Sequence, residues 1–117
     1  MTNGTNEKFE IRGVNHVALV CRDMAVTVRF YRDVLGMPLV KTISMPGDGQ
    51  HFFFDIGNGD HLAFFWFPDA GPSVPGVSNA GSMPGVDNFV TAHGSMNHLA
   101  FNVPLERFDE YRERLIA

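Results

Sequence analysis

The sequence predicts an α+β protein made of paired βαβββ modules, of which the second ends after its helix. One observation is a repeat, in which NHVAL at residues 15–19 returns as NHLAF at residues 97–101. A second is that similar helical segments follow at similar distances, YRDVL at 31–35 and YRERL at 111–115. A strand and a helix that recur together at one period indicate repeated structural modules.

The composition limits the classes of partner and compartment. A chain of 117 residues, 44% of them hydrophobic, suits one compact domain. Its net charge of −4 offers no basic surface, so we expect neither a nucleic acid nor a membrane as partner. The sequence contains no apolar run of about 18 residues and no signal-peptide pattern, and its single cysteine, Cys21, agrees with a reducing compartment. These features predict a cytoplasmic protein.

Module one, at about residues 10–68, begins with a strand and a helix. The alternating run VNHVALV at 14–20 predicts a strand that carries His16 on the same face as small residues. Asp23 is a suitable N-cap for the helix that follows, and Gly36 is a suitable αL stop.

Three strands complete this module. The first is predicted at 37–44, and two more, at 50–57 and 60–68, flank the dipeptide Asn58-Gly59, which favours a type I′ hairpin turn. Alternation along the last strand places four side chains on one face: His61, Ala63, Phe65 and Phe67.

A linking loop is predicted at about 69–95, where Gly, Pro, Ser and Asn predominate, and we expect it to form part of a substrate entrance. Partial module two, at about 96–117, contains the repeated strand and a helix opened by Pro104. Equivalent modules would require three more strands, so we expect the native chain to continue beyond Ala117, either absent from this sequence or disordered.

Three stretches carry a family resemblance: NHVALVCRDMAVTVRFYRDVLGMPLV, the hairpin that ends in HLAFFWFP, and NHLAFNVP before a helix. Together they resemble the vicinal oxygen chelate superfamily of glyoxalases, fosfomycin-resistance proteins, bleomycin-binding proteins and extradiol dioxygenases. The resemblance implies that two modules form a U-shaped sheet around a divalent metal, and that the protein is a homodimer. It further implies that His16 and His98 bind the metal, and that a third ligand, a carboxylate, lies beyond Ala117.

Ala63 distinguishes this sequence from the glyoxalase branch, which has a metal-binding glutamate at the matching position. An alanine can neither bind a metal nor abstract a proton. The sequence is therefore more similar to the extradiol dioxygenase branch, which implies Fe2+ as the favoured metal, with Mn2+ or Zn2+ as alternatives, and a catechol-type small-molecule substrate. The rival interpretations are a metal-dependent transferase or lyase, and a non-enzymatic protein that binds a planar aromatic compound.

Further candidate residues share the faces of the two expected ligands. His61 is a candidate acid or base, although a third nitrogen ligand or an exposed histidine are equal alternatives. Phe65 and Phe67 are candidate substrate-binding residues that would form an apolar wall, and Asn102 is another because alternation places it with His98.

The remaining polar residues near these motifs are expected to have no role in the chemistry. His51 and His93 are predicted to be exposed. Asn15 and Asn97 alternate to the face opposite their neighbouring histidines, so we expect them to stabilise strand ends.

Overall fold

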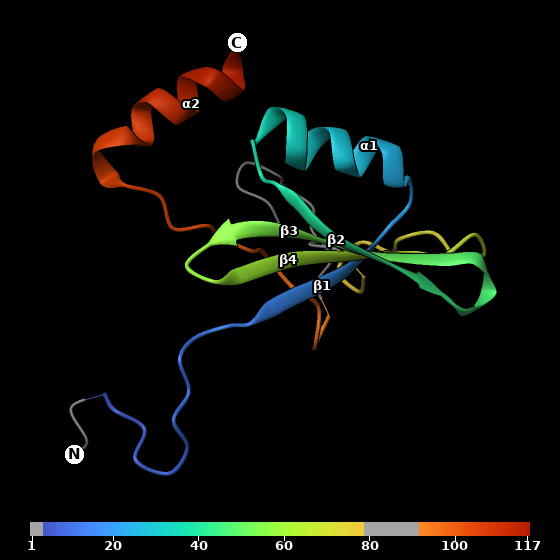
Figure 1. Cartoon of the computed structure of the whole chain (residues 1–117), viewed down its shortest axis with the longest axis horizontal. Helices are drawn as coiled ribbons and strands as arrows, with labels where there is room; N and C mark the ends of the chain where they lie inside the picture. Colours follow the sequence, from blue (N-terminus) through green and yellow to red (C-terminus); the bar gives the residue numbers. More distant parts are fainter. Residues whose placement is uncertain (1–3, 79–91) are drawn as a thin grey trace. The chain divides into compact units, whose positions relative to one another are not determined.

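The computed structural model describes residues 4–78 and 92–117 (Figure 1). The chain forms two units, Met1–Pro72 and Ser73–Ala117, and each is described by itself. Of the expected linking loop at 69–95, residues 79–91 lie outside the described residues, and the described parts 69–78 and 92–95 contain no helix or strand.

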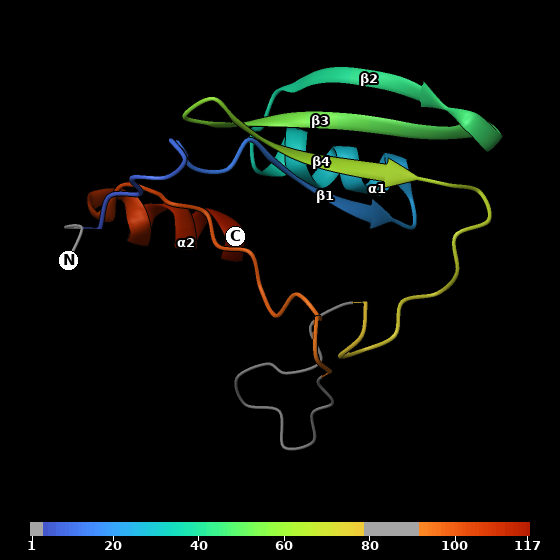
Figure 2. The same cartoon turned by 90° about the horizontal axis from the view of Figure 1, so that it is seen from below.

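The first unit is one βαβββ module with a four-stranded mixed sheet in the order β1-β4-β3-β2. Strand β1 pairs with β4 in parallel, and the other two pairings are antiparallel. Figures 1 and 2 show helix α1 along one face of this sheet. The elements are β1 (His16–Cys21), α1 (Met24–Val28), a π-helical segment (Arg29–Val34), β2 (Leu39–Met45), a 3₁₀ turn (Pro46–Asp48), β3 (Gly49–Gly57) and β4 (Asp60–Trp66).

The predicted helix begins and ends where its capping residues indicate. The Asp23 carboxylate accepts a hydrogen bond from the backbone N–H of Val26 at 3.1 Å, and Gly36 has the left-handed φ of 75°. The π-helical second half was not predicted: there, the N–H of Leu35 donates to the carbonyl of Phe30 at 3.0 Å. This segment is only six residues long, which is too short for apolar periodicity to distinguish a π-helix from an α-helix.

The core of the first unit lies between α1 and the sheet. Its buried members come from three strands: Cys21, Phe52, Phe54, Leu62 and Phe64. Tyr31, from the π-helical segment, packs with its ring centroid 5.7 Å from that of Phe54 and 5.1 Å from that of Phe64. Burial raises the pKa of the Cys21 thiol, so this cysteine is suited to packing and not to nucleophilic chemistry.

The β3–β4 hairpin has the predicted turn and an unexpected bulge. Asn58 and Gly59 have φ values of 56° and 79°, as a type I′ turn requires. Just before the turn, the register shifts between Asp55 and Gly57, which leaves Ile56 as an additional residue in β3. The Asp55 carboxylate accepts a hydrogen bond from the N–H of Gly57 at 2.7 Å and so stabilises this bulge.

This bulge decides which side chains of β3 share a face with those of β4. Phe53 is the register partner of Ala63, and His51 is the partner of Phe65. A hairpin without the bulge would shift the pairing by one residue and exchange the two faces of β3.

The second unit contains one helix in its described part, α2 (Phe108–Ile116), which follows a 3₁₀ turn at Leu105–Arg107. The strand predicted to repeat the first one is not formed, since residues 95–103 have no regular secondary structure. A strand requires a hydrogen-bonded neighbour, and none is present in the described part of this unit. The βαβββ architecture is therefore confirmed for module one, whereas the pairing of two modules in a U-shaped sheet stays a prediction.

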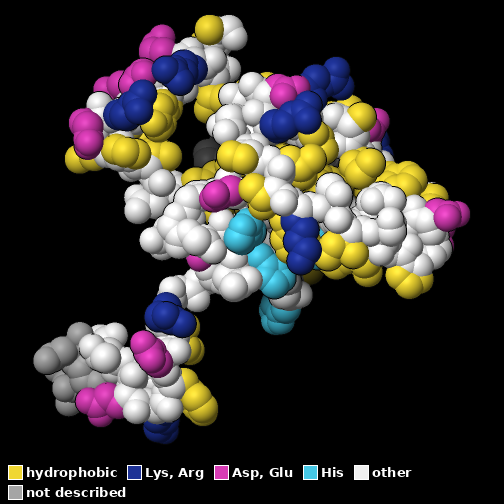
Figure 3. Space-filling view, viewed as in Figure 1, with side chains coloured by type: hydrophobic (Ala, Val, Ile, Leu, Met, Phe, Trp, Pro, Cys, Tyr) yellow, Lys and Arg dark blue, Asp and Glu magenta, His cyan; other side chains and the backbone are white. Residues whose placement is uncertain are grey.

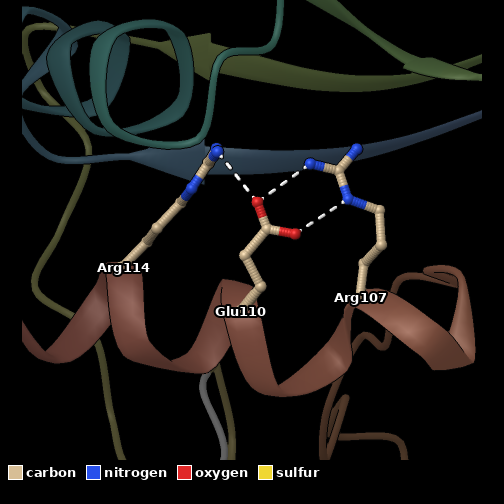
Figure 4. A network of polar contacts seen from close by, with 3 residues as sticks. All are labelled: Arg107, Glu110 and Arg114. Carbon is tan, nitrogen blue, oxygen red and sulfur yellow. Dashed lines mark hydrogen bonds and ion pairs between the residues drawn. The ribbon is translucent and has the colours of Figure 1, made fainter.

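Side chains of opposite character cover α2, with hydrophobic ones on one side and charged ones on the other (Figure 3). The Glu110 carboxylate accepts hydrogen bonds from Arg107 and Arg114, each at 3.0 Å (Figure 4). The hydrogen bonds from Arg107 are the main reason that the pKa of Glu110 is lowered. Such solvent-exposed pairs stabilise a helix only weakly.

Candidate functional site

Three histidines lie on the face of the sheet that is turned away from α1. His16 comes from β1, His61 from β4 and His51 from β3, and each alternates with residues that point into the core. His16 and His61 are register partners on parallel neighbouring strands. The pairing of β1 with β4 therefore brings His16 and His61 together on one face of the first unit.

His16 is exposed at the start of β1, and the side-chain amide of Asn15 forms a hydrogen bond with one of its ring nitrogens. The Nδ1 atom of His16 lies 2.8 Å from Oδ1 of Asn15. Because an amide oxygen only accepts hydrogen bonds, Nδ1 is the donor, and Nε2 of the neutral ring keeps its lone pair. The expectation that Asn15 serves the strand end alone is incomplete, since its side chain contacts the histidine. Its backbone carbonyl does bind the strand, by accepting from the N–H of His61 at 3.0 Å.

His98 has the same local arrangement in the second unit. Its Nδ1 atom lies 2.8 Å from Oδ1 of Asn97, and the ring is exposed. In both copies of the Asn-His repeat, no described residue forms a hydrogen bond with Nε2, and a neutral imidazole binds metals through such a nitrogen.

Ala63 stands where the glyoxalase branch has a glutamate. It is fully buried, with an exposed fraction of 0%. Its register partner Phe53 is half-buried, and the centroid of the Phe53 ring lies 5.9 Å from that of His16 and 6.4 Å from that of His61. Because β4 separates β3 from β1, the Phe53 ring must extend across β4 beside Ala63 to reach His16. An aromatic ring thus fills the space beside the small residue.

His51 is buried, so the prediction that it is exposed is wrong. Its ring stacks on Phe65 with a centroid distance of 3.7 Å and an interplanar angle of 2°, and its Nδ1 atom donates to the carbonyl of Phe64 at 3.1 Å. Neither His51 nor Phe53 was recognised as part of this face, because their orientation depends on the bulge at Ile56. The one sequence signal was their position opposite β4 across the Asn-Gly turn.

Phe65 and Phe67 lie together, as predicted, with their ring centroids 5.6 Å apart and an interplanar angle of 11°. Phe67 also packs directly on Gly49, where an added Cβ would lie 2.6 Å from Cδ1 of Phe67. We call the four rings in sequence along this face the aromatic row: Phe53, His51, Phe65 and Phe67. Lys41 adds a cation to it, with Nζ 5.8 Å from the Phe53 ring centroid.

Several expected contributions to a metal or substrate site are not assembled by the described residues. Within residues 4–78 and 92–117, no group of three His, Cys, Asp or Glu side chains could hold a metal ion. Asp55 is the register partner of His61, but its carboxylate already binds the Gly57 N–H. Asn102 is exposed in the irregular segment 95–103, and His93 is exposed as predicted. None of the described helices is long and apolar enough to span a membrane.

Comparison with a protein family gives a match over most of the chain. The sequence model of the Glyoxalase/Bleomycin resistance protein/Dioxygenase superfamily matches residues 13–115. This range contains both copies of the Asn-His repeat.

A curated relative carries a more specific name. The chain is 39% identical over 78 residues to a Bacillus subtilis (strain 168) protein named "Putative ring-cleaving dioxygenase MhqE". The match includes 62% of this chain but only 26% of the relative, so the chain spans about a quarter of that protein's length.

Solved structures of fosfomycin resistance proteins have a similar fold. The protein FosX from Listeria monocytogenes matches with a TM-score of 0.58 and 20% identity, over 92% of this chain and 68% of that one. FosX from Mesorhizobium loti matches with a TM-score of 0.56 and 22% identity, over 91% and 69%. One structure of the Listeria protein is a complex with Mn(II) and sulfate. At these identities the likeness shows the fold alone.

Proposed function

Because this chain belongs to the glyoxalase/bleomycin resistance protein/dioxygenase superfamily, we propose that it acts as a divalent-metal-dependent enzyme with extradiol dioxygenase-like chemistry on a catechol-type substrate. The observation that carries this proposal is the 39% identity to a relative named as a ring-cleaving dioxygenase. FosX shares the fold at about 20% identity, which supports no transferase or lyase activity for this chain.

We assign two metal ligands to the chain, His16 and His98. Their donor chemistry fits a divalent metal, since each is exposed, has Nδ1 bound to an asparagine, and has no hydrogen bond at Nε2 from any described residue. A carboxylate would be needed as the third ligand, because two histidines with one carboxylate form the set that suits Fe2+, with Mn2+ or Zn2+ as alternatives. When bound, such a metal would polarise adjacent substrate oxygens as a Lewis acid.

The chain's own residues would then orient the substrate and move protons. Phe65 and Phe67 would contribute apolar surface to an aromatic ring, and Asn102 would donate a hydrogen bond to a substrate oxygen. His61, half-buried and beside His16, would accept the proton of a substrate hydroxyl. Ala63 supplies no carboxylate for proton abstraction next to these histidines, in contrast to glyoxalase-type chemistry.

A second candidate function is non-enzymatic binding of a planar aromatic compound, and the aromatic row favours it. Four rings follow one another on a single face, and Lys41 lies next to the first of them. Such a surface could bind an aromatic ligand by stacking without any metal.

Metal analysis followed by oxygen uptake separates the two candidates. Anaerobically purified protein should contain stoichiometric Fe2+ and consume oxygen with at least one member of a catechol panel. His16→Ala and His98→Ala should each lose most of the metal, whereas the matched control His93→Ala, an exposed histidine outside the repeat, should keep it. Full metal content in His98→Ala would refute the ligand assignment, and ligand binding without metal would favour the second candidate. Size-exclusion chromatography tests the proposed homodimer.

A further inference from the structure

We infer that Asn15 and Asn97 are positioning residues that hold His16 and His98 in the tautomer with the proton on Nδ1. The two contacts are identical in atoms and in distance, Nδ1 to Oδ1 at 2.8 Å. They occur on different backbones, since His16 begins a paired strand and His98 lies in an irregular segment. The shared geometry therefore comes from the Asn-His dipeptide itself and does not require the sheet.

The hydrogen bond has a direct chemical consequence for the imidazole. A neutral histidine carries one ring proton, and in water this proton is favoured on Nε2. An acceptor at Nδ1 reverses this preference, because only the Nδ1–H tautomer can donate to it. The lone pair of Nε2 then points away from the asparagine and is available to a ligand.

Metal-binding histidines generally need a hydrogen-bond acceptor at the ring nitrogen that does not bind the metal. Such histidines donate their second ring N–H to a carboxylate, a carbonyl or water, and loss of that partner typically lowers metal affinity about 10- to 100-fold. In this chain the preceding side chain provides the acceptor. The consequence for metal affinity rests on the function proposed above, whereas the assignment of the tautomer does not.

Asn15 is itself held in place, which makes its side chain an effective acceptor. Its backbone carbonyl accepts from the N–H of His61 at 3.0 Å, which ties the residue to β4. One residue thus binds both histidines of the neighbouring strands, His61 through its backbone and His16 through its side chain.

Long-range ¹H–¹⁵N correlation spectra of the metal-free full chain, recorded above the pH range in which histidine titrates, test this inference. We expect His16 and His98 to be protonated on Nδ1 in the wild type. In Asn15→Ala, His16 should revert to the Nε2–H tautomer. In Asn97→Ala, His98 should revert in the same way. Asn15→Asp keeps an acceptor oxygen and should preserve the wild-type tautomer.

Two controls separate tautomer control from loss of structure. His51 donates from Nδ1 to the Phe64 carbonyl, so its signals should stay unchanged in every variant as long as the sheet is folded. Asn6→Ala removes another exposed asparagine, one whose Oδ1 accepts from the N–H groups of Lys8 and Phe9, and should alter neither histidine.

Metal titration of the same variants provides the second readout. Asn15→Ala should bind Fe2+ or Mn2+ about 10- to 100-fold more weakly than wild type. Asn15→Asp should show no such loss of affinity. An Nε2–H tautomer in the wild type, or an unchanged tautomer in Asn15→Ala, would overturn the inference. If the wild-type protein binds no metal, the proposed function fails, but the spectra of the metal-free chain still decide the tautomer.

Discussion

Introducing a glutamate at Ala63 tests whether the Phe53 ring occupies the place of the absent carboxylate. Ala63 has an exposed fraction of 0%, and Phe53 lies directly opposite on β3. Adding a long side chain to a filled site costs about 1–3 kcal/mol through overpacking. A buried polar group without a partner costs about another 1–3 kcal/mol. Ala63→Glu should therefore lower the free energy of unfolding by about 2–6 kcal/mol.

Thermal unfolding followed by circular dichroism measures this effect. For a unit of this size, each kcal/mol lowers Tm by roughly 4–8 °C, so we expect a loss of at least about 8 °C. The double variant Phe53→Ala/Ala63→Glu should recover part of this loss relative to the sum of the single changes, because removal of the ring opens the space. Ala18→Glu is the matched control, since Ala18 shares the face but is exposed. An Ala63→Glu protein that melts at the wild-type temperature would refute the reasoning.

Three further predictions concern other contacts. Gly49→Ala should destabilise the protein by about 1–3 kcal/mol in urea unfolding, because its Cβ would lie 2.6 Å from Cδ1 of Phe67; an unchanged midpoint would show that Phe67 moves freely. The pKa of Glu110 is lowered, so its stabilisation of α2 is present above the unfolded-state pKa and is lost as pH falls through the folded-state value. The amide chemical shifts of residues next to Glu110 should show this loss, and Glu110→Gln should remove the part of the pH dependence that comes from this carboxylate. Burial and a raised pKa should make alkylation of Cys21 much slower in the native protein than in denaturant, and equal rates would contradict its place in the core.

The features predicted correctly from the sequence are those that nearest neighbours decide. Asp23 caps its helix through a bond to a residue three positions along, and Asn58-Gly59 forms its turn through its own backbone angles. The shared face of His61 and Phe65 follows from alternation along a single strand. Each of these requires only a few consecutive residues.

The features that the sequence did not reveal depend on pairing between segments. Ile56 forms a bulge because its neighbours Asp55 and Gly57 both pair with β4. That bulge turns His51 and Phe53 toward the histidine face. The repeat NHLAF suggested a strand, but residues 97–101 have no neighbour to pair with in the described part of their unit. Similarity of sequence therefore preserved the Asn-His contact of the first copy without preserving its strand.

The bulge at Ile56 connects the core to the candidate site. Phe52 and Phe54 must face α1, since both are almost completely buried there. An unbulged hairpin would place Phe54 opposite Ala63 on the histidine face, and Phe52 and Phe54 would both leave the core. The register shift at Ile56 instead keeps these two residues in the core and places His51 and Phe53 on the histidine face. The requirement for a packed core thus determines which aromatic rings lie next to His16 and His61.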